Sequence, residues 1–281
     1  MQIGFIGQGW VGKAYADDFE ARGYNIVRYS LEQPYVLNKD AIATCDIVFI
    51  AVPTPTTEQG FDPSILRHVI KLVGKGNIAV VKSTILPGTT LSLQEENPDI
   101  FVLHNPEFLV EASAAYDASH PKRNLVGTPA VNEIYQKKAE LVVSVLPKAL
   151  YTRILPAADA ELVKYAGNCF LLTKVMFMNV LYDLVVETGG DWESVREALV
   201  HDPRIGESHT NPVHNGGRGA GGDCFVKDFE AFRRMYNEKV TNPYGQALLK
   251  ALKDENLHLL VNSGKNKELL QSVYGDVSSY T

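Results

Sequence analysis

The first twelve residues, MQIGFIGQGWVG (residues 1–12), decide the fold. Residues 2–6 are an apolar run of strand length, and Gly7, Gly9 and Gly12 follow in the spacing GxGxxG where a helical pattern begins. In such a strand–turn–helix unit the first glycine permits a tight turn and the second lets a pyrophosphate approach the backbone. The third allows the helix to pack closely on the strand. The N–H groups of the helix N-terminus then point at the phosphates. We therefore predict a dinucleotide-binding site at this turn.

Apolar runs of strand length alternate with helical patterns over the first half of the chain. Further strands are expected at residues 25–29, 47–52, 78–82, 100–103, 124–126 and 150–154, and helices at residues 11–22 and 131–145. This alternation is typical of βαβ units. It predicts a fold of the α/β class, with a Rossmann-like, doubly wound parallel sheet.

The pattern changes after Pro156. Helices are expected at residues 158–188, 192–200, 227–236 and 246–261, followed by a polar tail over residues 264–281. Asp191 is a good N-cap for the second of these helices. We expect two domains, a nucleotide-binding domain over residues 1–155 and an all-helical domain over residues 156–281.

Composition and charge exclude several classes of protein. The chain has 45% hydrophobic and 21% charged residues and a formal net charge of -6, which disfavours a nucleic-acid or anionic-membrane surface. The most apolar stretch, residues 170–186, contains Lys174, Asn179 and Asp183, and so predicts a buried helix and no membrane span. We expect a soluble protein without nucleic-acid or membrane partners.

Cysteine and histidine usage favours a reducing compartment without a metal site. The three cysteines have no CxxC spacing, which argues against a disulfide framework and a structural zinc site. His201, His209 and His214 fit no metal signature. The first residues lack the basic segment of a signal peptide. The expected location is the cytoplasm.

The segment GGRGAGGDCFVKD (residues 216–228) is the second informative motif. Five glycines in its first seven residues exclude a regular helix or strand. Cys224 stands where a helix is expected to begin, and there the helix dipole and a neighbouring cation favour the thiolate. In isolation, a flexible surface loop with a small buried cysteine explains the segment equally well.

This segment resembles the GxGxGGxCFxKD signature of the UDP-glucose/GDP-mannose dehydrogenase family. Five other segments are similar to motifs of the same family, namely residues 47–56 to its strand and VxTPT turn, 82–89 to KSTxxPGT, 105–111 to NPEFLxEG, 161–168 to ExxKxxxN, and 202–206 to DxRIG. Ala112 replaces the last glycine of the NPEFLxEG loop. The resemblance implies NAD-dependent oxidation of the C6 alcohol of a nucleotide sugar to the acid, as in polysaccharide biosynthesis.

The resemblance also implies catalytic roles. Cys224 is the expected nucleophile, and Glu107 the expected base for thioester hydrolysis. Lys164 and Asn168 are four residues apart on a helix, so they share a face and can stabilise one developing oxyanion. A partly desolvated Lys164 can also act as the base. Without the family, a solvated lysine and a surface asparagine would be the simpler interpretation.

The remaining site residues are likewise implied by the resemblance. Thr84 and Asp228 are expected to position the hydrolytic water and the lysine. Residues expected to contact substrate are Glu111, Arg204 and Gly221. Glu107 and Glu111 could share a helical face. Arg204 is expected to reach the substrate of a neighbouring subunit, although an ordinary surface arginine is a serious competitor. Residues expected to bind the cofactor are Gly7, Gly9, Trp10, Val11, Gly12, Ser30, Val52, Pro53, Thr54 and Thr84.

The end of the second strand bears on the choice of cofactor. Rossmann folds usually place an acidic residue there for the adenosine ribose, but this chain has Arg28, Tyr29 and Ser30, with Glu32 two residues on. Ser30 can hydrogen-bond a ribose hydroxyl, and no basic cluster follows it. We expect NAD to be preferred over NADP.

Two departures from the family pattern keep other functions open. Family members continue with a third α/β domain, whereas this chain ends about fifty residues after Asp228, and Asn179 is followed by Val180 where the family has glutamate. The chain is therefore expected to be a short form without the nucleotide-sugar-binding domain. The alternatives are a β-hydroxyacid dehydrogenase with a single hydride transfer, which needs no cysteine, and a non-catalytic nucleotide-binding homologue.

The long helix predicts an assembly. Apolar positions of residues 158–188 spread over more than one helical face, and a helix that is apolar on several sides must be covered on several sides. The simplest cover is the same helix of a second subunit about a two-fold axis. We expect a homodimer through the helical domain.

Overall fold

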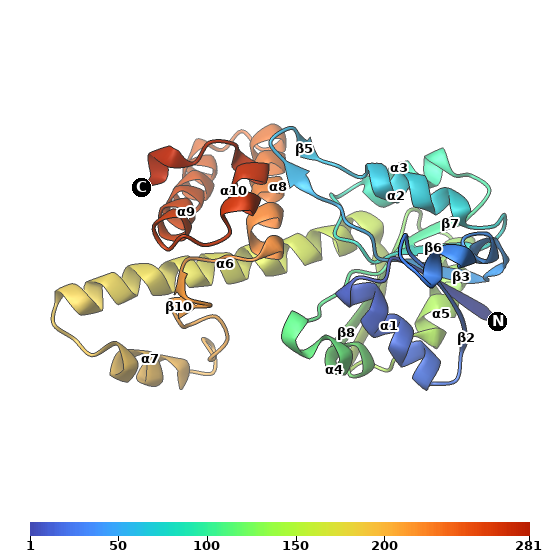
Figure 1. Ribbon diagram of the computed structural model, residues 1–281, viewed down its shortest axis with the longest axis horizontal. Coiled ribbons are helices and arrows are strands. Elements are labelled where there is room, and N and C mark those ends of the chain that lie inside the picture. Colours follow the sequence, from blue (N-terminus) through green and yellow to red (C-terminus); the bar gives the residue numbers. More distant parts are fainter. The chain divides into compact units, whose positions relative to one another are not determined.

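The computed structural model describes residues 1–281, which form two compact units. Unit 1 comprises Met1–Pro55 and Asp62–Lys164, and unit 2 comprises Thr56–Phe61 and Tyr165–Thr281. The boundary lies inside the long helix α6 (Ala157–Glu187), and a short hairpin from the first half of the chain belongs to unit 2 (Figure 1).

Unit 1 is built on a seven-stranded sheet with the order β2-β1-β3-β6-β7-β8-β9. The strands are β1 (Gln2–Ile6), β2 (Asn25–Tyr29), β3 (Ile47–Ile50), β6 (Ile78–Val81), β7 (Phe101–His104), β8 (Arg123–Thr128) and β9 (Tyr151–Pro156). The helices are α1 (Trp10–Ala21), α2 (Ser64–Val69), α3 (Thr89–Glu96), α4 (Ala114–Ser119) and α5 (Glu133–Val145), with short 3-10 turns η1 (Tyr35–Asn38), η2 (Asp40–Thr44), η3 (Ile70–Leu72) and η4 (Glu111–Ser113).

Helices cover both faces of this sheet, so its central strands are apolar throughout. Strands β3 and β6 are buried at every position. Helices α1, α4 and α5 lie on one face, and α2 and α3 on the other (Figure 1). Phe5, Phe19 and Phe49 form the centre of the first face, with ring centroids 5.2–5.3 Å apart. The predicted α/β architecture is confirmed.

The sheet is mixed, so the expectation of a wholly parallel sheet is wrong for its last two strands. β7 and β8 pair antiparallel at His104 and Gly127, and β9 runs parallel to β8. A parallel neighbour needs a crossover that returns the chain to the edge where strands begin. Residues 105–122 contain only η4 and α4, and they lead into β8 from the edge where β7 ends.

Unit 2 consists mainly of helices. After α6 come α7 (Trp192–Val200), α8 (Asp223–Lys239), α9 (Pro243–Asn262), α10 (Lys267–Tyr274) and the 3-10 turn η5 (Ser278–Tyr280). Unit 2 also contains two small hairpins. One pairs β4 (Thr56–Thr57) with β5 (Gly60–Phe61), and the other pairs β10 (Val213–His214) with β11 (Gly217–Arg218). Asp191 caps α7 as predicted, since its carboxylate accepts from Ser194 N at 2.9 Å.

Helix α10 replaces part of the expected polar tail. Leu270 and Val273 of α10 are fully buried against Val226 of α8 and against Leu257 and Leu260 of α9. Few apolar residues are needed for this short helix, because its stability comes from tertiary packing of one face. The predicted helices end at residue 261, and α10 is thus a further helix that was not predicted.

Helix α6 is long and apolar enough to cross a membrane by length and composition alone, with a mean hydropathy of 1.7 over its most apolar window. Only 39% of that window is buried, although the sequence predicts a buried helix. Much of the apolar surface of α6 is therefore exposed in the single chain.

Candidate active site

The glycine turn lies between β1 and α1, and each glycine has its own structural reason. Gly7 has a φ of 90°, and a Cβ there would lie 2.1 Å from Ala51 O. A Cβ on Gly12 would lie 2.0 Å from Gly7 O, whereas a Cβ on Gly9 would meet nothing within 4 Å. Gly9 thus leaves open space before Trp10, the first residue of α1, whose first turn has no acidic side chain. The turn fits the pyrophosphate of NAD, an anion at a positive helix end.

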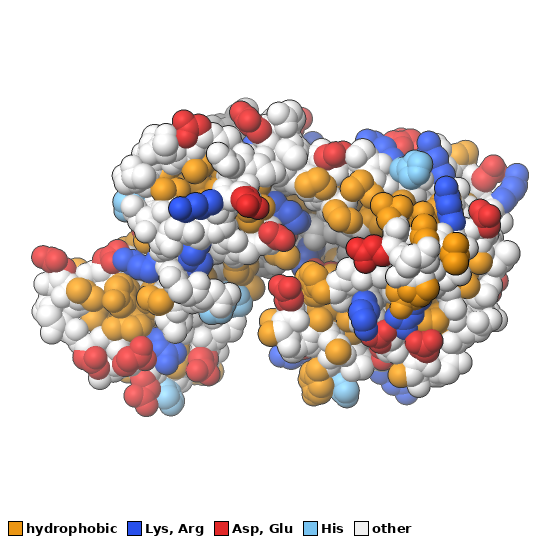
Figure 2. Space-filling view, viewed as in Figure 1, with side chains coloured by type: hydrophobic (Ala, Val, Ile, Leu, Met, Phe, Trp, Pro, Cys, Tyr) orange, Lys and Arg blue, Asp and Glu red, His pale blue; other side chains and the backbone are white.

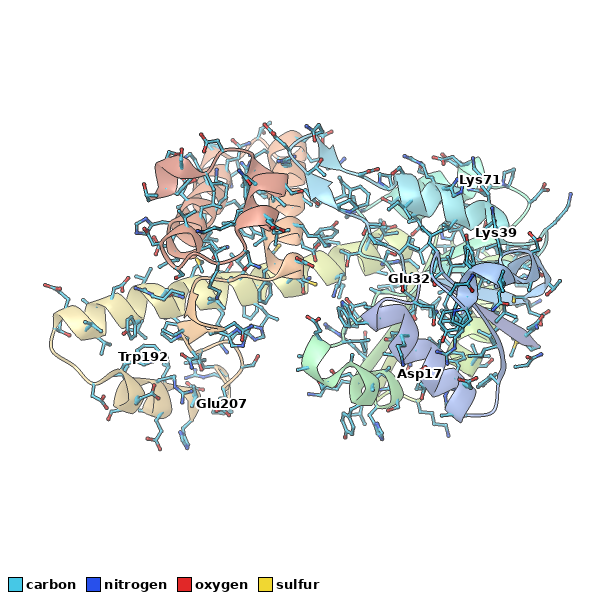
Figure 3. All side chains as sticks on the ribbon, in the orientation of Figure 1. Asp17, Glu32, Lys39, Lys71, Trp192 and Glu207 are labelled. Atoms are coloured by element: carbon cyan, nitrogen blue, oxygen red, sulfur yellow. The ribbon has the colours of Figure 1, made fainter.

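At the end of β2, the Ser30 hydroxyl is the group expected to meet the cofactor ribose, and Arg28 is held in ion pairs with α1. Arg28 is buried, and its guanidinium binds Asp17 and Glu20 of α1 at 2.6 and 2.7 Å. Asp17 lies on α1, whereas Glu32 lies exposed beyond the end of β2 (Figure 3). Ser30 Oγ accepts from Glu32 N at 3.3 Å. Arg28 is therefore held away from any 2′-phosphate.

The loops that follow β3 and β6 are joined by hydrogen bonds at the edge of the sheet where these strands end. Ser83 Oγ accepts from Val52 N at 3.0 Å and donates to Val52 O at 2.7 Å. Thr54 Oγ1 donates to Thr84 O at 2.7 Å, and Pro53 lies in sequence between Val52 and Thr54. The predicted cofactor residues of these loops thus lie together at the carboxyl edge, where ligands of such sheets bind.

Lys164 and Glu107 form a buried ion pair. Lys164 Nζ of α6 lies 2.6 Å from Glu107 Oε1 in the loop after β7, and both side chains are 7% exposed. The other carboxylate oxygen accepts from Leu109 N at 2.8 Å. At this depth each charge depends on the other, because an unpaired buried charge costs several kcal/mol.

Glu111 lies apart from this pair. It is exposed and begins η4, whereas residues 105–110 form no helix. The expectation that Glu107 and Glu111 share a helical face is wrong, because no helix joins the two residues.

A buried polar layer beneath the ends of β6 and β7 was not assigned from the sequence. Lys82 Nζ donates to Asn105 Oδ1 at 2.7 Å and lies 3.6 Å from the ring centroid of Tyr15. Burial lowers the pKa of Lys82 to about 7. His104 Nδ1 donates to Val81 O at 2.9 Å, and burial lowers the pKa of this imidazole to about 3, so it is neutral. The available signal was a lysine at the end of an apolar strand, which must find partners when buried.

Glu161 has a structural role. Its buried carboxylate accepts from Gly88 N at 2.6 Å, Thr90 N at 2.8 Å and Thr90 Oγ1 at 2.5 Å. Gly88 is the N-cap of α3 and has no side chain, so Glu161 caps that helix from α6. The glutamate of the ExxK pattern thus fixes α6 about one turn before Lys164.

Unit 2 brings a second group of predicted residues together. Asp228 of α8 is 1% exposed, and its carboxylate accepts from Asn168 Nδ2 at 2.6 Å and Lys227 Nζ at 2.5 Å. Cys224 is half-buried and is the second residue of α8. It lies four residues before Asp228, so both occupy one face of the helix. The neighbouring Cys169 is buried, which raises the pKa of its thiol.

The other predicted substrate residues lie in loops of unit 2. Arg204 is exposed, and its guanidinium binds Asp202 of its own turn at 2.5 Å. Gly221 lies in the loop before α8, where a Cβ would be 2.4 Å from Asn266 Oδ1. No group of three or more His, Cys, Asp or Glu side chains in the chain could hold a metal ion.

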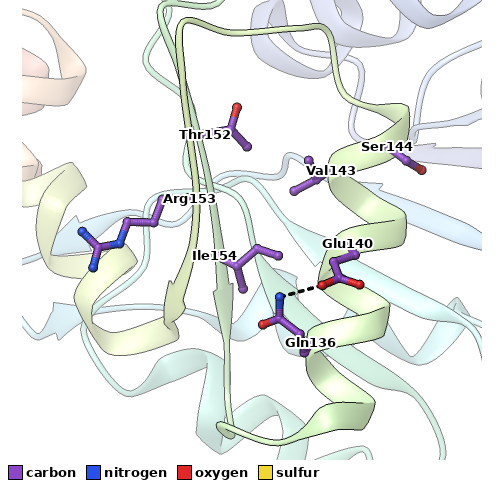
Figure 4. A pocket seen from close by; sticks show the side chains of 7 residues that line it. All are labelled: Gln136, Glu140, Val143, Ser144, Thr152, Arg153 and Ile154. Carbon is purple, nitrogen blue, oxygen red and sulfur yellow. Dashed lines mark hydrogen bonds between the residues drawn. The ribbon is translucent and has the colours of Figure 1, made fainter.

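Two surface hollows of unit 1 contain none of the predicted site residues. One, of about 450 Å³, lies between α5 and β9, where Gln136 Nε2 donates to Glu140 Oε1 at 2.9 Å (Figure 4). The other, of about 380 Å³, lies beside the ion pairs of Arg28 with Asp17 and Glu20. Neither is a candidate for the chemistry.

Two family models match the chain over most of its length. Residues 31–145 match the NAD binding domain of the UDP-glucose/GDP-mannose dehydrogenase family, and residues 158–257 match its central domain. The chain belongs to the UDP-glucose/GDP-mannose dehydrogenase family. The carboxyl-edge loops and the α6–α8 contact lie within these matched residues, whereas the glycine turn precedes them.

Individual relatives agree with this family. UDP-glucose 6-dehydrogenase of Pseudomonas aeruginosa is 32% identical over 255 residues, which cover 85% of this chain and 52% of that protein. The structure of a UDP-glucose dehydrogenase from Pyrobaculum islandicum has a TM-score of 0.75 and 29% identity, covering 91% of this chain and 67% of that one. The chain spans about half the length of the curated relatives it matches.

The fold is shared beyond nucleotide-sugar dehydrogenases. A 3-hydroxyisobutyrate dehydrogenase of Mycobacterium tuberculosis has a TM-score of 0.68 at 16% identity, covering 90% of this chain and 91% of that one. This likeness concerns the fold alone.

Proposed function

We propose that the chain oxidises a primary alcohol of a nucleotide sugar to the carboxylate, with NAD as the oxidant. The observation that carries the proposal is the placement of Cys224 on the first turn of α8, on the same face as Asp228, whose carboxylate holds Asn168. An enzyme that stops at an aldehyde or ketone needs no such nucleophile. Oxidation to an acid removes four electrons, and it therefore needs two hydride transfers and one water.

The residues of unit 1 support the first oxidation. NAD bound at the N-terminus of α1 would accept a hydride in each oxidation. Lys164, paired with Glu107, stabilises the oxygen of the alcohol while the proton of the hydroxyl passes to water. The products of this step are an aldehyde and one proton.

The residues of unit 2 support the second oxidation. The Cys224 thiolate adds to the aldehyde carbon, and the new oxyanion accepts a hydrogen bond from Asn168, whose amide has a second N–H besides the one bound to Asp228. Loss of a second hydride leaves a thioester. Glu107 then takes a proton from water, the hydroxide adds to the thioester carbon, and the Cys224 thiolate leaves as the acid forms.

Reaction stoichiometry tests the proposal. Purified protein is supplied with NAD and, in turn, UDP-glucose, GDP-mannose and UDP-N-acetylmannosamine, and both NADH and the sugar product are measured. We expect two NADH per sugar consumed. Cys224→Ser is expected to abolish acid formation, because serine neither adds readily to the aldehyde nor leaves as a thiolate does. Acid formation at the wild-type rate by Cys224→Ser would refute the covalent mechanism.

A β-hydroxyacid dehydrogenase is the second candidate, favoured by the shared fold and similar length of the 3-hydroxyisobutyrate dehydrogenase. It would form one NADH per substrate and would not depend on Cys224. A chain that binds NADH but turns over neither substrate class would instead be a non-catalytic homologue.

We further propose a cytoplasmic homodimer formed through α6. Phe170, Phe177, Val180 and Leu184 of α6 are 55–70% exposed, and their spacing places them on one stripe of the helix. Hydrophobic side chains gather on the surface over the end of α6 next to α7 (Figure 2). The self-pairing of Arg204 with Asp202 leaves this arginine on the surface, from which it would reach the substrate of the second subunit.

A further inference from the structure

The segment that leads to Cys224 has almost no side chains with which to hold itself in place. We call residues Gly216–Gly222 the glycine loop; five of its seven residues are glycine. Gly216, Gly219 and Gly222 have positive φ angles of 79°, 87° and 85°. The loop runs directly into α8, of which Cys224 is the second residue. The position of the Cys224 sulfur therefore depends on what holds the main chain of the glycine loop.

Asn256 of α9 holds the middle of the loop. Its Oδ1 accepts from Ala220 N at 2.8 Å, and its Nδ2 donates to Ala220 O at 3.1 Å. Both main-chain groups of one residue are thus bound by a single side-chain amide, as a neighbouring strand would bind them. Asn256 is 5% exposed, so these bonds are shielded from competing water. A Cβ on Gly219 would lie 3.2 Å from Asn256 Oδ1, which shows how closely the loop approaches α9.

The turn after α9 holds the two ends of the loop. Lys265 Nζ donates to His214 O at 2.8 Å, Gly217 O at 3.2 Å and Gly219 O at 3.4 Å. Three carbonyl oxygens converge on this ammonium, and they would repel one another without it. Ser263 Oγ accepts from Arg218 N at 2.8 Å, and Asn266 Oδ1 accepts from Gly222 N at 3.2 Å, two residues before Cys224.

Arg218 anchors the opposite side of the loop to α6. Its Nε donates to Asn179 Oδ1 at 2.8 Å, and its guanidinium binds Asp183 at 2.7 Å and lies 5.1 Å from the ring centroid of Tyr182. The loop is thus held between side chains of α6 and α9. Of these, Asn256 and Lys265 bind the main chain of the glycine loop at more than one point each.

We infer that Asn256 and Lys265 are positioning residues for the Cys224 nucleophile, an inference that rests on the proposed function. They touch neither substrate nor cofactor, and they act by fixing the glycine loop from which α8 and its cysteine start. Addition of a thiolate to an aldehyde requires the sulfur at about 3–3.5 Å from the carbon, and an error of about 1 Å costs roughly a hundredfold in rate. Their loss should therefore slow the sulfur-dependent second oxidation more than the first.

The test compares Asn256→Leu and Lys265→Met with Asn124→Leu. Asn124 is a matched control, because its buried amide also donates to a main-chain oxygen, Pro147 O at 2.7 Å, but in unit 1. Turnover is measured as kcat and KM for the nucleotide sugar, with aldehyde trapped by hydroxylamine. We expect Asn256→Leu and Lys265→Met to lose about a hundredfold in kcat for acid, with NADH per sugar falling from two toward one. Asn124→Leu should keep the wild-type ratio of two.

Alkylation of the cysteine gives a readout independent of turnover. Iodoacetamide is added to the free protein over a range of pH, with Cys224→Ser as the background. Cys45 and Cys169 are slow because burial raises the pKa of both thiols, that of Cys45 to about 11. We expect both loop variants to shift the pH profile of Cys224 alkylation, and Asn124→Leu to retain it.

The outcomes separate this inference from the proposed function. If Asn256→Leu does not fold, Lys265→Met decides by the same two measurements. Wild-type alkylation profiles and wild-type acid formation in the loop variants would overturn the positioning role. Full acid formation by Cys224→Ser would overturn the proposed function, while the alkylation profiles would still report whether Asn256 and Lys265 place the thiol.

Discussion

At the scale of single residues, the Lys164–Glu107 pair links stability to catalysis. Glu107→Gln preserves the shape of the side chain but leaves the Lys164 ammonium buried without a counter-charge. We expect a loss of about 3–5 kcal/mol in the free energy of unfolding, and a fall in kcat of about a hundredfold or more, because the proposed base for hydrolysis is removed. Urea unfolding and steady-state kinetics measure the two effects.

A double variant separates these effects. Glu107→Gln combined with Lys164→Met removes both charges, so the stability should return toward the wild-type value while the activity stays low. Stability that remains as low in the double variant as in Glu107→Gln would mean that the buried charge is not the cause of the loss.

The second residue-scale prediction concerns Lys82 and the pH dependence of the free energy of unfolding. Burial lowers the pKa of this lysine to about 7 in the folded chain, from 10.5 for a lysine in water, against a smaller opposing effect of Glu107. Between these values the unfolded chain binds a proton that the folded chain does not bind. Stability should therefore rise with pH above 7, by at most about 1.4 kcal/mol per pH unit, and this gain should be absent below pH 7.

The comparison is with Lys82→Met, which has no titrating group at this position. Urea unfolding of both proteins between pH 7 and 9.5 gives the difference in slope, and titration of other groups cancels. Parallel stability curves for the two proteins would show that Lys82 keeps its proton on folding.

The candidate residues could be predicted from sequence, but many of their contacts could not. Helical spacing placed Lys164 and Asn168 on one face, yet each takes its bond from a distant segment, Lys164 from Glu107 and Asn168 from Asp228. Such partners depend on tertiary folding. The contacts of Asn256 and Lys265 with the glycine loop could not be predicted for the same reason, since no sequence pattern in the loop indicates which residues bind its main chain.

At the scale of elements, the glycine turn separates binding from packing. Gly9 has φ -64° and ψ -179°, which alanine adopts, and a Cβ there meets nothing within 4 Å. Gly9→Ala should keep the wild-type stability but weaken NADH binding by roughly tenfold or more, because the Cβ occupies the space of the pyrophosphate. Gly12→Ala should weaken binding and also cost about 1–3 kcal/mol of stability, because its Cβ meets Gly7 O at 2.0 Å.

NADH fluorescence and urea unfolding measure the two quantities for each variant. Equal loss of stability in Gly9→Ala and Gly12→Ala would contradict the distinct roles of the two glycines. Unchanged NADH affinity in Gly9→Ala would place the cofactor elsewhere.

Most elements followed from hydrophobic patterning, and the failures have identifiable physical causes. Strand runs such as residues 47–50 carry a clear signal, but an apolar run has no direction, so the reversal of β8 and β9 could not be foreseen. The α10 helix looked polar because only one narrow face is apolar. Its Leu270 and Val273 are fully buried only because α8 and α9 cover them.

At the scale of the whole molecule, the boundaries of the two units could not be predicted fully from the sequence. The composition changes near Pro156, yet unit 1 continues to Lys164, and the hairpin Thr56–Phe61 belongs to unit 2. Arg234 of α8 explains the hairpin, since its Nη1 donates to Thr57 O at 2.8 Å. A contact between residues so far apart in sequence leaves no periodic trace.

The exposed stripe of α6 leads to the last prediction, which concerns assembly. Phe170, Phe177 and Leu184 are 70%, 59% and 60% exposed and follow at intervals of seven residues. A two-fold axis brings each such residue close to the same stripe of the partner, so one substitution acts twice. Phe177→Glu should therefore convert a dimer to a monomer, because two carboxylates would have to be buried together. Activity should fall with it if Arg204 acts across the interface.

Light scattering at micromolar concentration measures the mass, and Leu150→Glu is the matched control. Leu150 is 97% exposed and lies before β9 in unit 1, so the same charge there should leave the dimer intact. A wild-type chain that is folded, active and strictly monomeric would refute both the dimer and the role of Arg204. Sedimentation of the wild-type chain with phosphatidylcholine vesicles, abolished by Phe177→Glu, would instead mean that the stripe of α6 meets lipid.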